Sequence, residues 1–138
     1  MSRFVLDASI ALAWCFDDEA TEQTDLLLAR ARDHGAHVPS LWHLDFTNVL
    51  LQAERRGRIT AADIAARLQL LAVLPIETDN ETHRRAARET LALARAERLT
   101  SYDAAYLELA MRRGLPLASR DADLLRAAKG QGVTILAS

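Results

Sequence analysis

The chain has 138 residues, a mass of 15.3 kDa and a formal net charge of −2, a length that fits one domain over residues 1–138. Half of the residues are hydrophobic and 26% are charged, which excludes an intrinsically disordered chain. The single cysteine, Cys15, excludes an internal disulfide, and no apolar run reaches the ~18 residues that a membrane span needs.

Apolar runs alternate with helix-like stretches along the first half of the chain. Residues 3–6 are apolar enough for a buried parallel strand. The acidic Asp7 comes too early in the chain for a signal peptide, so we expect a cytoplasmic protein. Ser9 is placed to cap a helix that extends to about Phe16. The next expected elements are a helix over 21–33, a short strand over 37–39 and a helix over 41–56.

The second half continues the same alternation. Thr60 resembles a helix cap, and the helix that it opens reaches about Ala72 with a buried stripe of Ile64, Leu68 and Leu71. The remaining expected elements are strands over 73–77, 115–119 and 133–136 and helices over 82–98, 101–113 and 121–129. Because no linker or repeat interrupts this order, the sequence predicts a three-layer α/β/α fold with a mostly parallel central sheet.

Acidic side chains follow the predicted strands. Asp7 comes directly after the first strand, Asp121 lies two residues beyond the strand over 115–119, and Asp103 stands in the first turn of a helix. Ligands of open α/β sheets bind beyond the carboxyl ends of the strands, where helices also begin. We therefore expect these three carboxylates to converge.

Each of these acids has an alternative explanation. Asp103 is also favoured by the helix dipole, and Asp121 could simply cap the helix that follows it. Asp7 is harder to explain in this way, because a lone ionised group resists burial beside an apolar strand. Asp45 lies in the helix over 41–56, with Asn48 three residues further on, and it could be an ordinary exposed acid.

The other polar residues point to a hard metal ion. No pair of histidines has zinc-ligand spacing, and Cys15 beside Trp14 fits a buried, inert thiol. A cluster of carboxylates alone suits Mg²⁺ or Mn²⁺, with water molecules completing the octahedron. Lys129 is the only lysine among 17 basic residues, and the arginines group at 55–58, 84–88 and 112–113. These groups could bind phosphates or could decorate solvated helix faces.

Four segments of the chain resemble the PIN-domain family, and they are most similar to the VapC-type toxins of bacterial toxin–antitoxin pairs. The resemblance covers essentially the whole chain in order. The matching segments are Val5-Leu6-Asp7-Ala8-Ser9, Pro39-Ser40-Leu41-Trp42 leading to Asp45 and Asn48, Tyr102-Asp103-Ala104-Ala105-Tyr106, and Pro116-Leu117-Ala118-Ser119-Arg120-Asp121.

The resemblance implies an endoribonuclease that depends on Mg²⁺ or Mn²⁺, is a homodimer and is inhibited by a small antitoxin. Asp7 and Asp103 match the metal ligands of the family, and Asp121 matches its later acid, with Asp123 nearby. Ser9 and Ser119 match small hydroxyl residues that orient carboxylates or water. Asp45 stands where the family usually has glutamate, so its carboxylate reaches less far, and catalytic geometry is sensitive to displacements of ~1 Å.

Three other functions are compared with this expectation. A PIN-like module that binds RNA or an antitoxin without turnover remains open because of Asp45. A phosphatase of the haloacid-dehalogenase type would need a second aspartate where Ser9 stands. A receiver domain would need a lysine near the end of its last strand, whereas Lys129 precedes that strand.

Overall fold

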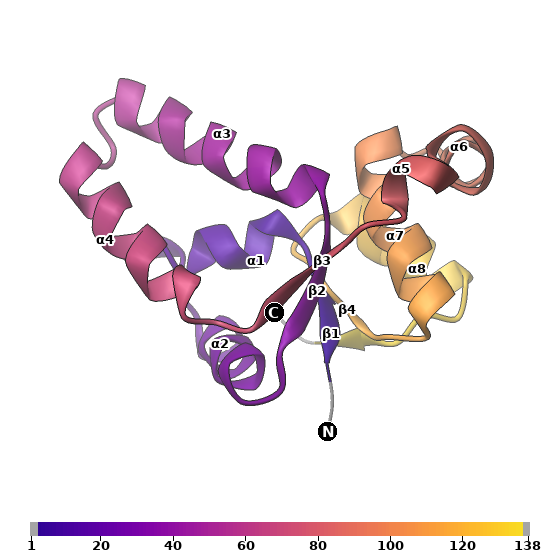
Figure 1. Ribbon diagram of the computed structural model, residues 1–138, viewed down its shortest axis with the longest axis horizontal. Helices are drawn as coiled ribbons and strands as arrows, with labels where there is room; N and C mark the ends of the chain where they lie inside the picture. The colour runs from indigo at the N-terminus through magenta and orange to yellow at the C-terminus, as the bar shows by residue number, and fades with distance from the viewer. Residues whose placement is uncertain (1–2, 137–138) are drawn as a thin grey trace.

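The computed structural model describes residues 3–136, and its centre is a sheet of five parallel strands (Figure 1). The strand order is β3-β2-β1-β4-β5, so β1 lies in the middle of the sheet. Val5 of β1 is paired with His37 of β2 on one side and with Leu117 of β4 on the other. The strands are β1 (Phe4–Leu6), β2 (Ala36–Pro39), β3 (Ile76–Asp79), β4 (Leu117–Ala118) and β5 (Ile135–Leu136).

Helices cover both faces of this sheet (Figure 1), which confirms the predicted three-layer α/β/α fold. Helices α1 to α4 lie on one side, and α5 to α8 lie on the other. Their bounds are α1 (Ala8–Ala13), α2 (Glu22–His34), α3 (Leu41–Arg55), α4 (Ala61–Ala72), α5 (Thr82–Arg85), α6 (Leu91–Glu97), α7 (Ser101–Arg113) and α8 (Ala122–Gly130), with a 3₁₀ turn η1 (Asp17–Glu19) and a π-helical turn η2 (Ala86–Thr90). Within residues 3–136, no helix is long and apolar enough to cross a membrane.

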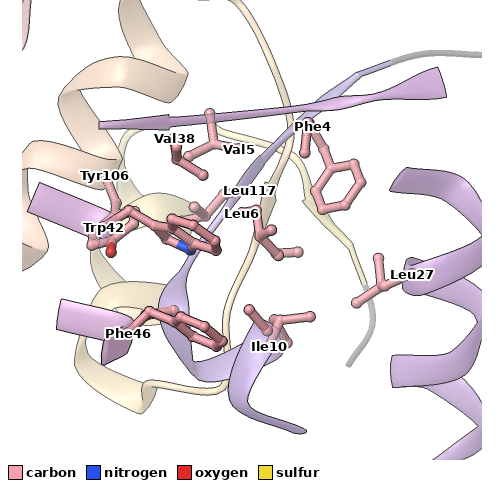
Figure 2. Packing of buried hydrophobic residues seen from close by; sticks show 14 of the residues in the cluster. Phe4, Val5, Leu6, Ile10, Leu27, Val38, Trp42, Phe46, Tyr106 and Leu117 are labelled. Carbon is pink, nitrogen blue, oxygen red and sulfur yellow. The ribbon is translucent and has the colours of Figure 1, made fainter. Parts of the chain in front are cut away.

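The core fixes the strand that leads into the predicted site. Phe4, Val5 and Leu6 are fully buried between the two helical layers, as Figure 2 shows. Trp42 and Phe46 of α3 stack with ring centroids 5.2 Å apart and cover the same cluster. Burying a large apolar side chain stabilises a fold by about 1.5–3 kcal/mol, so the chain that leaves β1 at Asp7 is firmly held.

The first helix begins earlier than predicted. Asp7, not Ser9, occupies the residue before α1, and its side chain makes no capping hydrogen bond. The prediction rested on serine as a common N-cap, but both Ser9 and Asp7 are used in a different interaction, described below.

Helix α4 carries no fully buried residue, so the predicted buried stripe is wrong in part. Leu68 is 39% exposed, and Ile64 and Leu71 are partly buried against the core. The reason is the position of α4, which lies beyond α3 at the edge of the molecule (Figure 1).

The strand predicted over 73–77 lies further along the chain, at Ile76–Asp79. Val73 is the residue that caps the end of α4, and the chain enters the strand after Pro75. The helix predicted over 82–98 is divided by the π-helical turn η2 and ends at Arg98, which has a left-handed backbone (φ 57°). The shift in β3 matters because it makes Asp79 the last residue of a strand.

Candidate active site

Asp7 leaves the central strand at its carboxyl end and is buried. Its Oδ2 atom accepts a hydrogen bond of 2.7 Å from the Ser9 hydroxyl and one of 2.6 Å from the Ser119 hydroxyl. Burial raises the pKa of Asp7, the two hydroxyl hydrogen bonds oppose this rise, and the nearby charges of Asp45 and Asp121 add to it. The net effect is a raised pKa, so the ionised form of the Asp7 carboxylate is less stable in the folded protein than in water.

The two serine hydroxyls are themselves oriented by backbone groups. Ser9 Oγ accepts a hydrogen bond of 3.0 Å from the Arg120 backbone N–H, and Ser119 Oγ accepts one of 3.0 Å from the Asp121 backbone N–H. Because each oxygen already accepts a hydrogen bond, each hydroxyl proton is directed at Asp7. This arrangement holds the Asp7 carboxylate in one orientation and joins it to the segment after β4.

Asp103 lies in the first turn of α7, and the Thr100 hydroxyl caps this helix by accepting from the Asp103 backbone N–H at 3.1 Å. The Asp103 side chain is half-buried. Burial, followed by the negative charges of Asp121, Asp7 and Asp45, raises its pKa to about 6. These charges act on Asp103 only because the fold brings the acids to the same edge of the sheet.

Asp45 and Asp121 complete the acidic group in different ways. Asp45 is exposed on α3, and its Oδ2 accepts a hydrogen bond of 3.3 Å from the Tyr106 hydroxyl. Tyr106 is fully buried in α7, so a fixed group contacts the side chain that sequence reasoning treated as uncertain. Asp121 caps α8 by accepting from the Leu124 backbone N–H at 2.9 Å, as one alternative from the sequence proposed, and its charge also acts on Asp103.

Asn48 and Asp123 lie further out. Both are exposed, Asn48 on α3 beyond Asp45 and Asp123 in the first turn of α8. The charge of Asp123 is the smallest of the acidic contributions to the pKa of Asp103. Their placement fits outer, supporting positions.

The group of acids has the chemistry of a site for a hard divalent cation. Two of its carboxyl groups, Asp7 and Asp103, have raised pKa values because they are buried and lie near other acids. A bound cation would stabilise their ionised forms and reduce the repulsion between the carboxylates. Within residues 3–136, no three acidic, histidine or cysteine side chains converge tightly enough to enclose an ion. Mg²⁺ usually retains several waters and binds through one or two carboxylates, so the residues present fit that ion.

Asp79 is a buried acid at a strand end that sequence reasoning missed, because β3 was placed too early. Its carboxylate accepts two hydrogen bonds from Arg112, of 3.0 and 2.8 Å, and one of 2.8 Å from the Thr82 hydroxyl. Burial alone would raise the pKa of Asp79, but the Arg112 and Thr82 hydrogen bonds lower it below its ordinary value. Asp79 is thus neutralised by an arginine, unlike Asp7 and Asp103.

These contacts of Asp79 change the interpretation of the arginine group at 112–113. Arg112 is held by Asp79 and Glu108, and Arg113 lies 3.7 Å from Asp79, so the group at 112–113 braces the fold. Arg120, which stood outside all three groups, is the arginine whose backbone contacts the site. The position of Arg120 between Ser119 and Asp121 could have indicated from the sequence that it lies at the site.

Protonation of Asp7 and Asp103 is expected to stabilise the metal-free protein as the pH falls from about 7 to about 4.5. Burial lowers the pKa of His37, so this histidine acts in the opposite direction over the same range. Asp103 and Asp7 both bind protons more tightly in the folded state than the ordinary value of 3.8 allows, so folding is favoured as they protonate. Asp79 has a lowered pKa, and its stabilising effect is lost only at more acidic pH. Thermal unfolding in EDTA across this range measures the effect.

Added Mg²⁺ should stabilise the protein most at neutral pH, because protons compete with the cation. Asp103→Asn should remove the contribution of Asp103 from the pH dependence measured in EDTA, while that of His37 remains. If the stability of the wild-type protein relative to Asp103→Asn did not increase from the neutral to the acidic end of this range, the assigned electrostatics of Asp103 would be contradicted.

Known proteins resemble this chain in sequence and in fold. A family model described as PIN domain matches residues 4–130. The chain is similar to the crystal structure of PAE2754 from Pyrobaculum aerophilum, with a TM-score of 0.70 and 26% sequence identity over 94% of this chain and 88% of that one. A search of curated proteins returned no significant match.

Proposed function

The chain belongs to the PIN domain family, and from this membership we propose that it is an endoribonuclease that requires Mg²⁺. PIN domains are generally metal-dependent nucleases, typically using a divalent ion such as Mg²⁺. The observation that carries the proposal is the gathering of Asp7, Asp45 and Asp121 near Asp103: their negative charges add to the effect of burial, and together these raise the pKa of Asp103 to about 6. Cleavage of RNA that depends on added Mg²⁺ tests it.

In this proposal, Asp7 and Asp103 hold the ion. Both serine hydroxyls donate to Oδ2 of Asp7 and hold this carboxylate in one orientation. A bound cation would supply positive charge for the phosphoryl oxygens and would lower the pKa of a water at the site. Asp45 and Asp121 orient water at the edge of the site, or assist a second ion, and Mn²⁺ is a possible substitute.

The finer proposal is that the protein is a VapC-type toxin. Its support is the set of four segments around Asp7, Asp45, Asp103 and Asp121 that resemble those toxins, together with a length suited to a single PIN-like domain. On this proposal the partners are an RNA substrate, a small cognate antitoxin and a second copy of the chain, in the cytoplasm. Co-purification with the product of a neighbouring short gene, and loss of ribonuclease activity in that complex, would test the toxin assignment.

The second candidate is a PIN-like module that binds RNA or an antitoxin without turnover. It rests on Asp45, whose side chain is one methylene shorter than the glutamate of related proteins. We favour the enzyme because the buried Tyr106 hydroxyl contacts Asp45 at 3.3 Å and restrains the shorter side chain within the acidic group.

Asp45→Glu is expected to change kcat less than about tenfold, because Tyr106 already restrains the acid at this position. If the shorter side chain of Asp45 instead left its carboxylate misplaced by ~1 Å, kcat could be about a hundredfold too low, and glutamate would restore it. Tyr106→Phe should lower kcat by about tenfold, as the loss of an outer group that orients a ligand often does. Single-turnover cleavage of RNA measures both. An inactive wild-type protein that gained cleavage on Asp45→Glu would favour the binding module.

A further inference from the structure

The acidic turn η1 holds arginines that approach the site from other parts of the chain. Arg58 lies 2.7 Å from Glu19 and 3.0 Å from Asp18, and Arg67 lies 3.2 Å from Asp17. Arg120 Nη1 lies 3.3 Å from Glu19 Oε1. Glu19 therefore bridges two arginines, Arg58 through one oxygen and Arg120 through the other.

Arg120 is the member of this group that is joined to the acidic site. Its backbone N–H donates to Ser9 Oγ at 3.0 Å, and Ser9 donates to Asp7 at 2.7 Å. Its neighbours in the chain are Ser119 and Asp121, which also belong to the site. The backbone of Arg120 is thus connected to the Asp7 carboxylate through two successive hydrogen bonds, by way of the Ser9 hydroxyl.

The two arginines on Glu19 are held to different degrees. Arg58 pairs with both Asp18 and Glu19, and its guanidinium also lies 4.0 Å above the ring of Phe16. Arg120 makes one longer contact, and the side chains of Arg120 and Glu19 are 36% and 29% exposed. Arg120 can therefore exchange Glu19 for another anion while Arg58 remains in place.

Such an exchange would favour the approach of a nucleic acid to this site. The acidic group repels phosphates, the chain has a net charge of −2, and Arg112 is occupied by Asp79 and Glu108. A guanidinium can bind a phosphate with the same forked geometry that it uses for a carboxylate. We propose that Arg120 binds an RNA phosphate beside the scissile one, and that Glu19 occupies Arg120 in the free protein and so competes with RNA.

This inference rests on the proposed ribonuclease function, but RNA binding in EDTA tests it without cleavage. The probe is a fluorescein-labelled single-stranded RNA, and its anisotropy is followed over a salt titration. Glu19→Gln should lower the Kd by about fivefold, the upper range for an exposed ion pair. Arg120→Gln should raise the Kd and lower the slope of log Kd against log salt by about 0.7, the value for one phosphate contact.

The double variant Glu19→Gln/Arg120→Gln should bind as weakly as Arg120→Gln alone, because Glu19 acts through Arg120. Asp33→Asn is the matched control, since it removes the same charge from an exposed pair with Arg32. Asp33 precedes β2 and so lies at the opposite edge of the sheet from the site. Its effect on the Kd should be less than twofold.

Two results would overturn the inference. If Glu19→Gln weakened RNA binding as Arg120→Gln does, the ion pair would only brace the segment after β4. If Glu19→Gln and Asp33→Asn tightened binding equally, the effect would be one of net charge. If the variants showed the expected Kd values but the wild-type protein never cleaved RNA, the proposed function would be contradicted. The competition between Glu19 and RNA would still be supported.

Discussion

Asp7→Asn is expected to reduce RNA cleavage by about 10²–10³-fold in kcat, the range seen when a main electrostatic element of an active site is removed. The substitution keeps the size of the side chain and an oxygen that can accept from Ser9 and Ser119. It removes the negative charge that the proposed cation needs. Single-turnover cleavage under saturating protein, together with Mg²⁺ titration by calorimetry, measures both losses.

The same substitution should leave the fold intact or stabilise it. The pKa of Asp7 is raised by burial, so an uncharged amide is favoured over the ionised carboxylate at neutral pH. Asp103→Asn should show the same pattern of lost cleavage with a retained fold, and Asp33→Asn is the control at a remote, exposed acid. Unchanged cleavage in both Asp7→Asn and Asp103→Asn would contradict the assignment of these residues.

Arg112→Met is expected to lower the free energy of unfolding by about 3–5 kcal/mol at neutral pH, the usual cost of breaking a buried ion pair. Arg112 is the group that neutralises Asp79, whose side chain is fully buried, and Glu108, whose side chain is 6% exposed. Methionine keeps much of the side-chain volume but leaves both acids without this partner. Urea-induced unfolding followed by circular dichroism measures the loss.

The pH dependence of this loss identifies its cause. In the wild-type protein, the lowered pKa of Asp79 contributes stability that is present above the ordinary value of 3.8 and is lost as the pH falls further. Without Arg112, the remaining contacts with Thr82 and Arg113 oppose burial less, so the pKa of Asp79 should lie above its wild-type value. Acidification should therefore narrow the difference in stability between the variant and the wild-type protein. The exposed pair of Arg32 and Asp33 should contribute little to stability in a parallel Asp33→Asn measurement, because solvent screens it. A loss below about 1 kcal/mol for Arg112→Met, too small for a buried pair, would contradict the proposed role.

The fold was predictable because its signals are local. The apolar β1, the cap at Thr100 and the stop at Gly114 act within a few residues of the elements that they define, and the structure places β1 and α7 there. The convergence of Asp7 with Asp103 followed from one further rule, that strand ends and helix starts share an edge of a parallel sheet.

The remaining features depend on contacts between distant segments. The residues from Val73 to Glu77 were predicted to form a strand, but α4 ends only at Ala72 and the strand begins at Ile76. Because of this shift, β3 ends at Asp79. Whether an acid at a strand end is free for a cation depends on an arginine 33 residues away, as Asp79 and Arg112 show. The sequence pattern alone does not report such a partner.

Ser9 illustrates the same limit at shorter range. Its position after a strand favoured a capping role, but its hydroxyl donates to Asp7 and accepts from the backbone N–H of Arg120 instead. The resemblance to related proteins assigned Ser9 and Ser119 an orienting role, and the hydrogen bonds provide a physical basis for it.

The most direct test of the central claim is cleavage of single-stranded RNA by the purified protein in Mg²⁺ and in EDTA. We expect endonucleolytic products in Mg²⁺, none in EDTA, and recovery when Mg²⁺ is restored in excess. The Asp103→Asn protein, prepared in parallel, controls for a contaminating nuclease and should yield no products. Cleavage that persisted in EDTA, or that was equal in wild-type and Asp103→Asn protein, would contradict a metal-dependent ribonuclease built on these acids.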